Sequence, residues 1–194
     1  MIEAIGYNLA RLADFSGRED RPTFWWYVLF LVIVDVVVSV IASGVLFAGS
    51  MASMFQNAQA GGDPVALQAQ MMQQMAPHML TMMWVSGSLK VAIALLSVAA
   101  FVRRLHDSNS SGWWAALAVA VQVVTVAIAL SMASQIEGTV AAIAAGDLSP
   151  AVNGQLEISR MSLIGWIAPL LVLVFGAMRS SPGPNRYGEA PKAG

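Results

Sequence analysis

The chain contains no cysteine and few charged residues, and each shortage excludes classes of protein. Without cysteine there is no disulfide, no thiolate nucleophile and no zinc site built on sulfur ligands. Lys, Arg, Asp and Glu make up 11% of the 194 residues, against roughly 25% in soluble domains. The formal net charge is −1, so the composition does not favour nucleic acid as a partner.

Apolar residues are abundant instead, and they form long runs. Hydrophobic residues account for 57% of the chain, and the mean hydropathy is +0.66. A helix needs about 20 mostly apolar residues to cross a bilayer core of about 30 Å. Runs of about that length lie at residues 24–47, 80–102, 113–133 and 161–178. Because lipid offers no partner to open backbone groups, we predict an all-α bundle of four transmembrane helices in one membrane domain.

The basic residues predict the orientation of the four spans, because cytoplasmic segments carry an excess of Lys and Arg. Basic residues gather in the N-terminal segment, in the short connection between the second and third spans, and in the tail 179–194. They are Arg11, Arg18, Arg21, Arg103, Arg104, Arg179, Arg186 and Lys192. Arg160 is the only basic residue in the two predicted outer loops, 48–79 and 134–160. We therefore predict that both termini are cytoplasmic.

Two segments outside the spans have helical periodicity. In residues 2–13 the apolar side chains recur at helical spacing, at Ile2, Ile5, Leu9 and Leu12. This pattern predicts a short amphipathic helix that lies on the inner leaflet or packs on the bundle. In the first outer loop, Leu67, Met71 and Met75 share one helical face, which favours a helix at the outer interface.

Three blocks of sequence resemble a known family. They are Phe15–Arg21 followed by Phe24-Trp25-Trp26, Arg103–Asp107 followed by Ser111–Trp114, and Pro182–Gly188. In type, order and placement they are similar to the bacterial inner-membrane family catalogued as domain of unknown function 805. The resemblance covers most of the chain and implies a multi-pass inner-membrane protein, but it implies no particular activity. The long outer loops depart from the family pattern, so the resemblance says nothing about them.

The predicted topology brings all three blocks to the cytoplasmic face. The candidate residues for binding a lipid or a partner there are Arg18, Arg21, Arg103, Arg104, His106, Asp107, Trp113, Trp114 and Arg186. Basic residues at a membrane surface attract anionic headgroups, and arginine can bind a phosphate with two parallel hydrogen bonds. The alternative is that the arginines only orient the chain and pair with Glu19, Asp20 and Asp107.

Asp35 and Lys90 are ionisable residues inside predicted spans, where charge is expensive. At ~1.5 Å per residue their distances from the cytoplasmic ends of the first two spans are nearly equal. We predict a buried Asp35–Lys90 pair that fixes helix rotation and register. One alternative is a proton or ion path with Gln122 and Thr125, and another is a Lys90 side chain that extends toward the outer surface.

Small residues in the first span permit close contact with another helix, including one from a second copy of the chain. These residues are Ser39, Ser43, Gly44 and Ala48. The sequence therefore allows a homo-oligomer or another membrane protein as a partner, beside the lipid bilayer itself.

Neither a metal site nor an enzyme is expected. Thioethers near the second span would suit copper(I), but methionine is also an ordinary apolar residue at a bilayer edge. His106 beside Asp107 has the residue types of an acid–base pair, yet adjacent side chains in a tight connection diverge. The chain has no phosphate-binding loop and no dinucleotide, metalloprotease or serine-hydrolase motif. We predict a non-enzymatic scaffold or docking protein without a cofactor; a small transporter or channel is the alternative.

Overall fold

The computed structural model describes residues 1–59, 64–133 and 135–191. Over these residues the chain forms seven helices. They are α1 (Ile2–Leu9), α2 (Arg21–Gln59), α3 (Pro64–Asp107), α4 (Trp113–Ala133), α5 (Ile136–Ala144), α6 (Ser149–Gly165) and α7 (Ile167–Ala177). The β-type pairing within the same residues is limited to an isolated bridge between Asn185 and Gly188.

Four helical segments of the described chain are long and apolar enough to cross a membrane. They are Arg21–Gly49, Pro77–Asp107, Trp113–Ala133 and Val152–Ala177. This confirms the predicted all-α fold with four spans, and it makes the chain a multi-pass membrane protein.

The helices reach further than the apolar runs indicated. α2 continues to Gln59 and α3 begins at Pro64, so most of the predicted loop 48–79 is helical. Residues 64–76 continue α3 and do not form the separate interfacial helix that we predicted; their side chains, including Leu67, Met71 and Met75, lie outside the described part. The predicted loop 134–160 likewise contains α5 and the start of α6. Alanine, glutamine and methionine are strong helix formers, which explains why helix persists beyond the apolar runs.

The fourth span consists of two helices that meet at Trp166. Pro169 has no backbone N–H, so it cannot donate to the carbonyl of Gly165, and its ring crowds that carbonyl. The α-helical hydrogen bonds resume with Leu170, whose N–H donates to the Trp166 carbonyl at 3.0 Å. The break between α6 and α7 therefore follows from the proline.

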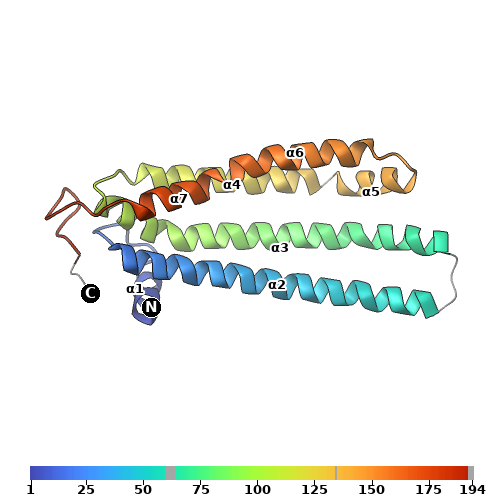
Figure 1. Ribbon diagram of the computed structural model, residues 1–194, viewed down its shortest axis with the longest axis horizontal. Coiled ribbons are helices and arrows are strands. Elements are labelled where there is room, and N and C mark those ends of the chain that lie inside the picture. Colours follow the sequence, from blue (N-terminus) through green and yellow to red (C-terminus); the bar gives the residue numbers. More distant parts are fainter. Residues whose placement is uncertain (60–63, 134, 192–194) are drawn as a thin grey trace.

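The long helices run side by side along one axis, and both chain termini lie at the same end of the bundle (Figure 1). The turn between α3 and α4 lies there too, and we call this the terminal end. Helix α1 crosses the bundle axis at the terminal end. It buries Ala4 and Asn8, whereas Ile2 and Leu9 are 80% and 43% exposed. Helix α1 thus packs on the bundle, which was one of the two predicted interpretations, and it leaves apolar side chains uncovered. Its contact with the inner leaflet stays a prediction.

The buried apolar core lies toward the terminal end. It contains Phe24, Tyr27, Leu31, Ala100, Phe101, Leu105, Ala115, Ala118 and Ala168. Helix α7 approaches α2 so closely that a Cβ atom on Gly176 would lie 2.8 Å from Cε1 of Phe24. Buried polar residues lie next to this tightly packed core, in the segment before α2 and in the last turns of α3.

Candidate functional site

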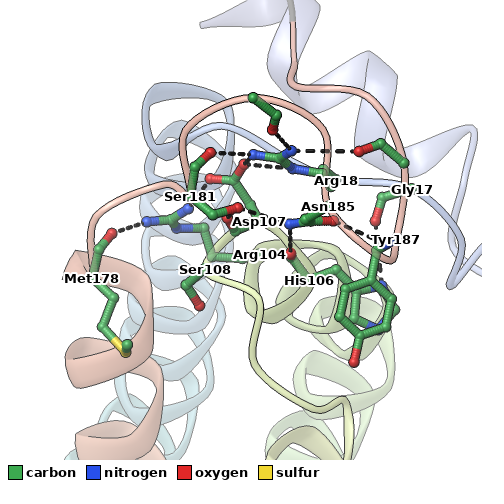
Figure 2. Close-up of polar contacts among 12 residues, drawn as sticks. Gly17, Arg18, Arg104, His106, Asp107, Ser108, Met178, Ser181, Asn185 and Tyr187 are labelled. Carbon is green, nitrogen blue, oxygen red and sulfur yellow. Dashed lines mark hydrogen bonds and ion pairs between the residues drawn. The ribbon is translucent and has the colours of Figure 1, made fainter.

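Asp107, the last residue of α3, is buried between two arginines. Arg18 donates from Nε and Nη2 to Asp107 Oδ1, at 3.1 and 3.0 Å. Arg104 donates from Nη1 to the other oxygen, Oδ2, and from Nε to the Gly176 carbonyl at 3.1 Å. All three side chains are at most 1% exposed. Figure 2 shows the carboxylate held by both guanidinium groups. The site thus joins the segment before α2, the end of α3 and the end of α7.

A second buried ion pair lies beside the first. Arg103 donates from Nε to Glu19 Oε2 at 3.0 Å, and from Nη2 to the side-chain oxygen of Asn8 at 2.6 Å. The amide of Asn8 donates in turn to Glu19 Oε1 at 2.8 Å. Arg103 also donates to the backbone carbonyls of Arg11 and Asp14. This pair fixes α1 and its following turn to the end of α3.

We call these six buried side chains the arginine cluster: Asn8, Arg18, Glu19, Arg103, Arg104 and Asp107. Burial raises the pKa of Glu19 above its ordinary value of 4.5, and the hydrogen bond from Asn8 and the charge of Arg103 oppose the shift. A buried carboxylate is stable only when such partners replace the water it has lost. The cluster therefore depends on each of its members.

The tail after α7 folds back over the arginine cluster. Arg18 donates from Nη1 to the Gly183 carbonyl at 2.6 Å and from Nη2 to the Ser181 carbonyl at 2.8 Å. The N–H of Ser181 donates to the Asp107 carbonyl at 2.8 Å. Gly183 has a φ of +68°, a left-handed conformation that suits glycine. The block Pro182–Gly188 is thus a turn that covers the arginines.

His106 and Asp107 do not form an acid–base pair. The His106 ring stacks on Tyr187 with centroids 3.7 Å apart, and its Nδ1 faces the Gly17 carbonyl at 3.3 Å (Figure 2). The Asp107 carboxylate is occupied by Arg18 and Arg104. The two adjacent side chains diverge as their positions in a tight connection predicted, and His106 helps to hold the tail.

Exposed basic and aromatic residues surround the arginine cluster. Trp26, Trp113 and Trp114 are 43%, 79% and 42% exposed. Arginines that make no ion pair within the described residues also lie around it; we call them the rim arginines, Arg11, Arg21, Arg179 and Arg186. The turn after α1, the starts of α2 and α4, and the tail thus carry the groups that could reach a ligand.

The predicted candidates therefore divide into two groups. Arg18, Arg103, Arg104 and Asp107 come together, but they are buried and their hydrogen bonds are made within the chain. Of the other candidates, Arg21 is partly exposed and Arg186 is exposed, where Arg186 donates to the Asn109 carbonyl at 3.3 Å. Only this outer group is accessible to a headgroup.

Asp35 and Lys90 form an ion pair between α2 and α3, with 2.6 Å between Nζ and Oδ2. The predicted burial of this pair is wrong: the side chain of Lys90 is 49% exposed and that of Asp35 is 23% exposed. The reason is that α2 lies at the edge of the bundle, and many of its apolar side chains near Asp35 are exposed as well.

Thr125, one of the polar residues of α4, makes its contacts away from the Asp35–Lys90 pair. It donates to the carbonyl of Val121 in its own helix at 2.8 Å. A Cβ atom on Gly165 of α6 would lie 3.5 Å from the Thr125 methyl group, so Thr125 faces α6.

Sequence reasoning missed several members of the site. Asn8 was hidden inside an apolar pattern, although a lone amide on a short amphipathic helix is a signal for a buried contact. The carbonyls of Gly176, Ser181 and Gly183 accept from arginines, and no side-chain pattern reveals carbonyl acceptors. Tyr187 lies within the third block, Pro182–Gly188, and the sequence indicated no specific role for this side chain.

Comparison with known proteins gives one match. No curated protein and no solved structure matches the chain. A family model described as "Protein of unknown function (DUF805)" matches residues 12–189. That range includes all three sequence blocks and every residue of the arginine cluster except Asn8. The chain therefore belongs to the DUF805 family of proteins of unknown function.

Proposed function

We propose that this protein is a non-enzymatic scaffold of the bacterial inner membrane, with both termini cytoplasmic, that docks on anionic phospholipid headgroups. The observation that carries the proposal is the ring of exposed tryptophans and rim arginines around a buried, fully bonded arginine cluster. Indole is favoured at the level of the headgroups, and basic residues there attract anionic lipid. The buried cluster supports this ring by holding α1, the ends of α3 and α7, and the tail together.

The distribution of charge supports a cytoplasmic terminal end. Arg11 precedes α2, Arg21 is the first residue of α2, and Arg179 and Arg186 follow α7. Arg103 and Arg104 lie in the last turns of α3. Because positive segments stay on the cytoplasmic side, this end of the bundle would face the cytoplasm. The absence of native cysteine makes the orientation simple to test: a Ser110→Cys variant should react with an impermeant maleimide only after the inner face is exposed. Labelling of intact spheroplasts would contradict the orientation.

The lipid docking is tested with the rim arginines that lie beyond α7. Arg179→Gln combined with Arg186→Gln removes two exposed charges and leaves the arginine cluster intact. At about 1 kcal/mol for each basic residue, the double variant should bind anionic lipid weaker by about 2 kcal/mol. The measurement is the retention of phosphatidylglycerol over phosphatidylcholine by native mass spectrometry of the solubilised protein.

Arg160→Gln provides the matched control, because this arginine lies in α6, away from the rim. We expect Arg160→Gln to retain anionic lipid as the wild type does. Equal retention by the Arg179→Gln/Arg186→Gln variant would contradict docking through the rim.

The transporter alternative makes a different prediction. It requires Asp35, Lys90, Gln122 and Thr125 to serve one path, and the contacts of Thr125 with its own helix and with α6 do not support that arrangement. Asp35→Asn should abolish ion flux in proteoliposomes if the alternative is correct. Under our proposal, Asp35→Asn leaves anionic lipid retention unchanged.

A further inference from the structure

The Asp35–Lys90 ion pair lies in the middle of the membrane-spanning region. Asp35 is the middle residue of the span Arg21–Gly49, and Lys90 lies close to the middle of the span Pro77–Asp107. Their side chains meet at 2.6 Å, so the two charges are at nearly the same depth. Ionisable groups at this depth are expensive unless other polar groups surround them.

The hydrogen bonding of this pair is incomplete within one chain. A lysine ammonium group has three N–H donors, and Asp35 Oδ2 accepts from it. Within the described residues, Oδ1 of Asp35 is buried and has no hydrogen-bond partner, so only Oδ2 is placed to meet a group from outside the chain. The Lys90 side chain is 49% exposed, and because Lys90 lies near the middle of a membrane-spanning helix, the surface beside it would face hydrocarbon and not water. Lipid cannot satisfy the remaining donors, so acceptors must come from elsewhere.

The surface around the pair is suited to another helix. For much of its length α2 has α3 as its neighbour, and its other sides are open (Figure 1). Ser39 and Ser43 follow Asp35 at intervals of four residues, so they lie on the same face, and Gly44 has nothing within 4 Å of a Cβ position. The Ser43 hydroxyl donates to the Ser39 carbonyl at 2.7 Å, which leaves the lone pairs of its oxygen for a donor from another helix. Small residues let helix backbones approach closely in lipid.

We infer that α2 and α3 form a homodimer interface in which the Asp35–Lys90 pair faces the same pair of a second copy. Asp35 comes from α2 and Lys90 from the adjacent α3, so the two charges lie side by side at one depth and not one above the other along a helix. A two-fold axis along the membrane normal reverses the order of the two charges in the second copy. Asp35 of each copy then faces Lys90 of the other, and the four charges alternate in sign.

Charge complementarity is what selects a second copy as the occupant. Closed two-fold interfaces use the same surface on both subunits, and this surface carries one charge of each sign at one depth. A single lysine or a single aspartate would repel its own copy across such an axis. The combination supplies each ammonium group with a second carboxylate in a place where lipid supplies none.

Reversing the pair gives a sharp test. In Asp35→Lys/Lys90→Asp the pair within one chain is retained with opposite polarity, and two copies of this variant still match each other. A wild-type copy facing a reversed copy places Asp35 against an aspartate and Lys90 against a lysine. Such like-charge contacts strongly disfavour association. The reversed variant should therefore associate with itself and not with the wild type.

The measurement is energy transfer in liposomes at increasing dilution with lipid. Because the native chain has no cysteine, Ala190→Cys in the exposed tail provides a unique position for a donor or an acceptor dye. We expect transfer for wild type with wild type and for reversed with reversed. Mixed partners should associate more weakly by at least about tenfold, since like charges would then meet across the interface. The self-association of the reversed variant shows in the same experiment that it folds.

A second variant removes the charges. Asp35→Leu combined with Lys90→Met should lose energy transfer and keep the anionic lipid retention of the wild type. Transfer between mixed partners as strong as between matched ones would overturn the inference, as would a monomeric wild type at every dilution. Ion flux that depends on Asp35 without any change in transfer would overturn it too, because a water-filled path would then surround the pair. None of these outcomes bears on docking at the rim.

Discussion

Two sets of ion pairs in this protein show how differently a membrane chain can place its charges. At the terminal end, Arg18, Arg104 and Asp107 are at most 1% exposed, and backbone carbonyls of the tail complete their hydrogen bonds. In the middle of the bundle, Lys90 and Asp35 are 49% and 23% exposed, and one carboxylate oxygen has no partner within the described residues. The first set is complete within one chain. The second is incomplete within the described residues.

This difference separates stability from association. A buried charge with all its partners contributes to the fold chiefly through what its removal leaves behind, an unpaired charge without water. A charged pair that faces lipid contributes little to the fold of one copy, but it discriminates strongly between partners. Under our two proposals, the arginine cluster is a structural unit that carries the docking surface, and the Asp35–Lys90 pair is the unit that recognises a second copy.

The largest expected effect is at Asp107. Asp107→Asn leaves Arg18 and Arg104 buried with one neutral partner, and breaking a buried ion pair in this way costs about 3–5 kcal/mol. We expect a corresponding fall in the free energy of unfolding in detergent micelles, measured by chemical denaturation.

The control for this change is Asp35→Leu with Lys90→Met, which removes both charges of the exposed pair. Apolar replacement of both partners is often neutral or stabilising, so the fold of this variant should be at least as stable as the wild type. If the double variant were destabilised as strongly as Asp107→Asn, the distinction between the two sets of charges would be lost.

A smaller effect is expected from two glycines in the two regions. A Cβ atom on Gly176 would lie 2.8 Å from Phe24 and 2.9 Å from Trp25, so Gly176→Ala should overpack the terminal end by about 1–3 kcal/mol. Gly44 has nothing within 4 Å of a Cβ position, so Gly44→Ala should leave the fold intact. Thermal unfolding of both variants measures the contrast, and equal midpoints would contradict the tight packing of α7 on α2.

The smallest effect on stability is expected at two aspartates in exposed turns. Asp14 lies before α2 and Asp147 lies between α5 and α6, and the two should behave alike. Hydrogen bonds from the Ser16 hydroxyl and N–H lower the pKa of Asp14 below its ordinary value of 3.8, and Ser149 does the same to Asp147. A carboxyl whose pKa is lowered by folding stabilises the fold above its unfolded pKa, and this contribution is lost as the pH falls through the folded value.

Ser16→Ala should therefore raise the pKa of Asp14 toward 3.8, and Ser149→Ala should raise that of Asp147 similarly. Carboxyl carbon chemical shifts measured during an acid titration report both values. An Asp14 pKa that does not respond to Ser16→Ala would show that the nearby arginines, and not the turn, lower it.

The sequence predicted the spans well because their signal is strong. A run of apolar residues long enough to cross lipid has few alternative structures, and the four runs lie within the four observed spans apart from Met178. The extension of α2 and α3 beyond the runs was missed, because helix propensity in an Ala-, Gln- and Met-rich segment is a weak signal beside hydrophobicity. The break at Trp166 follows from Pro169.

The site was predicted less completely. Equal depth brought Asp35 and Lys90 together correctly, but exposure depends on which helices neighbour α2, and hydropathy does not contain that information. Pairing of Arg103 with Glu19 was one of two interpretations of the arginine-rich face, and burial favours it. The return of the tail over Arg18 was not predictable, because its contacts are made by backbone carbonyls.

The exchange of backbone amides in the tail tests the central claim that the terminal end is one bonded unit. The N–H of Ser181 donates to the Asp107 carbonyl, and that of Gly188 to the Asn185 carbonyl. In the wild-type protein in nanodiscs, we expect slow hydrogen–deuterium exchange at these amides. We expect fast exchange in Arg18→Gln and wild-type exchange in Asp35→Leu/Lys90→Met. Fast exchange of the tail in the wild type, or no change in Arg18→Gln, would contradict the claim.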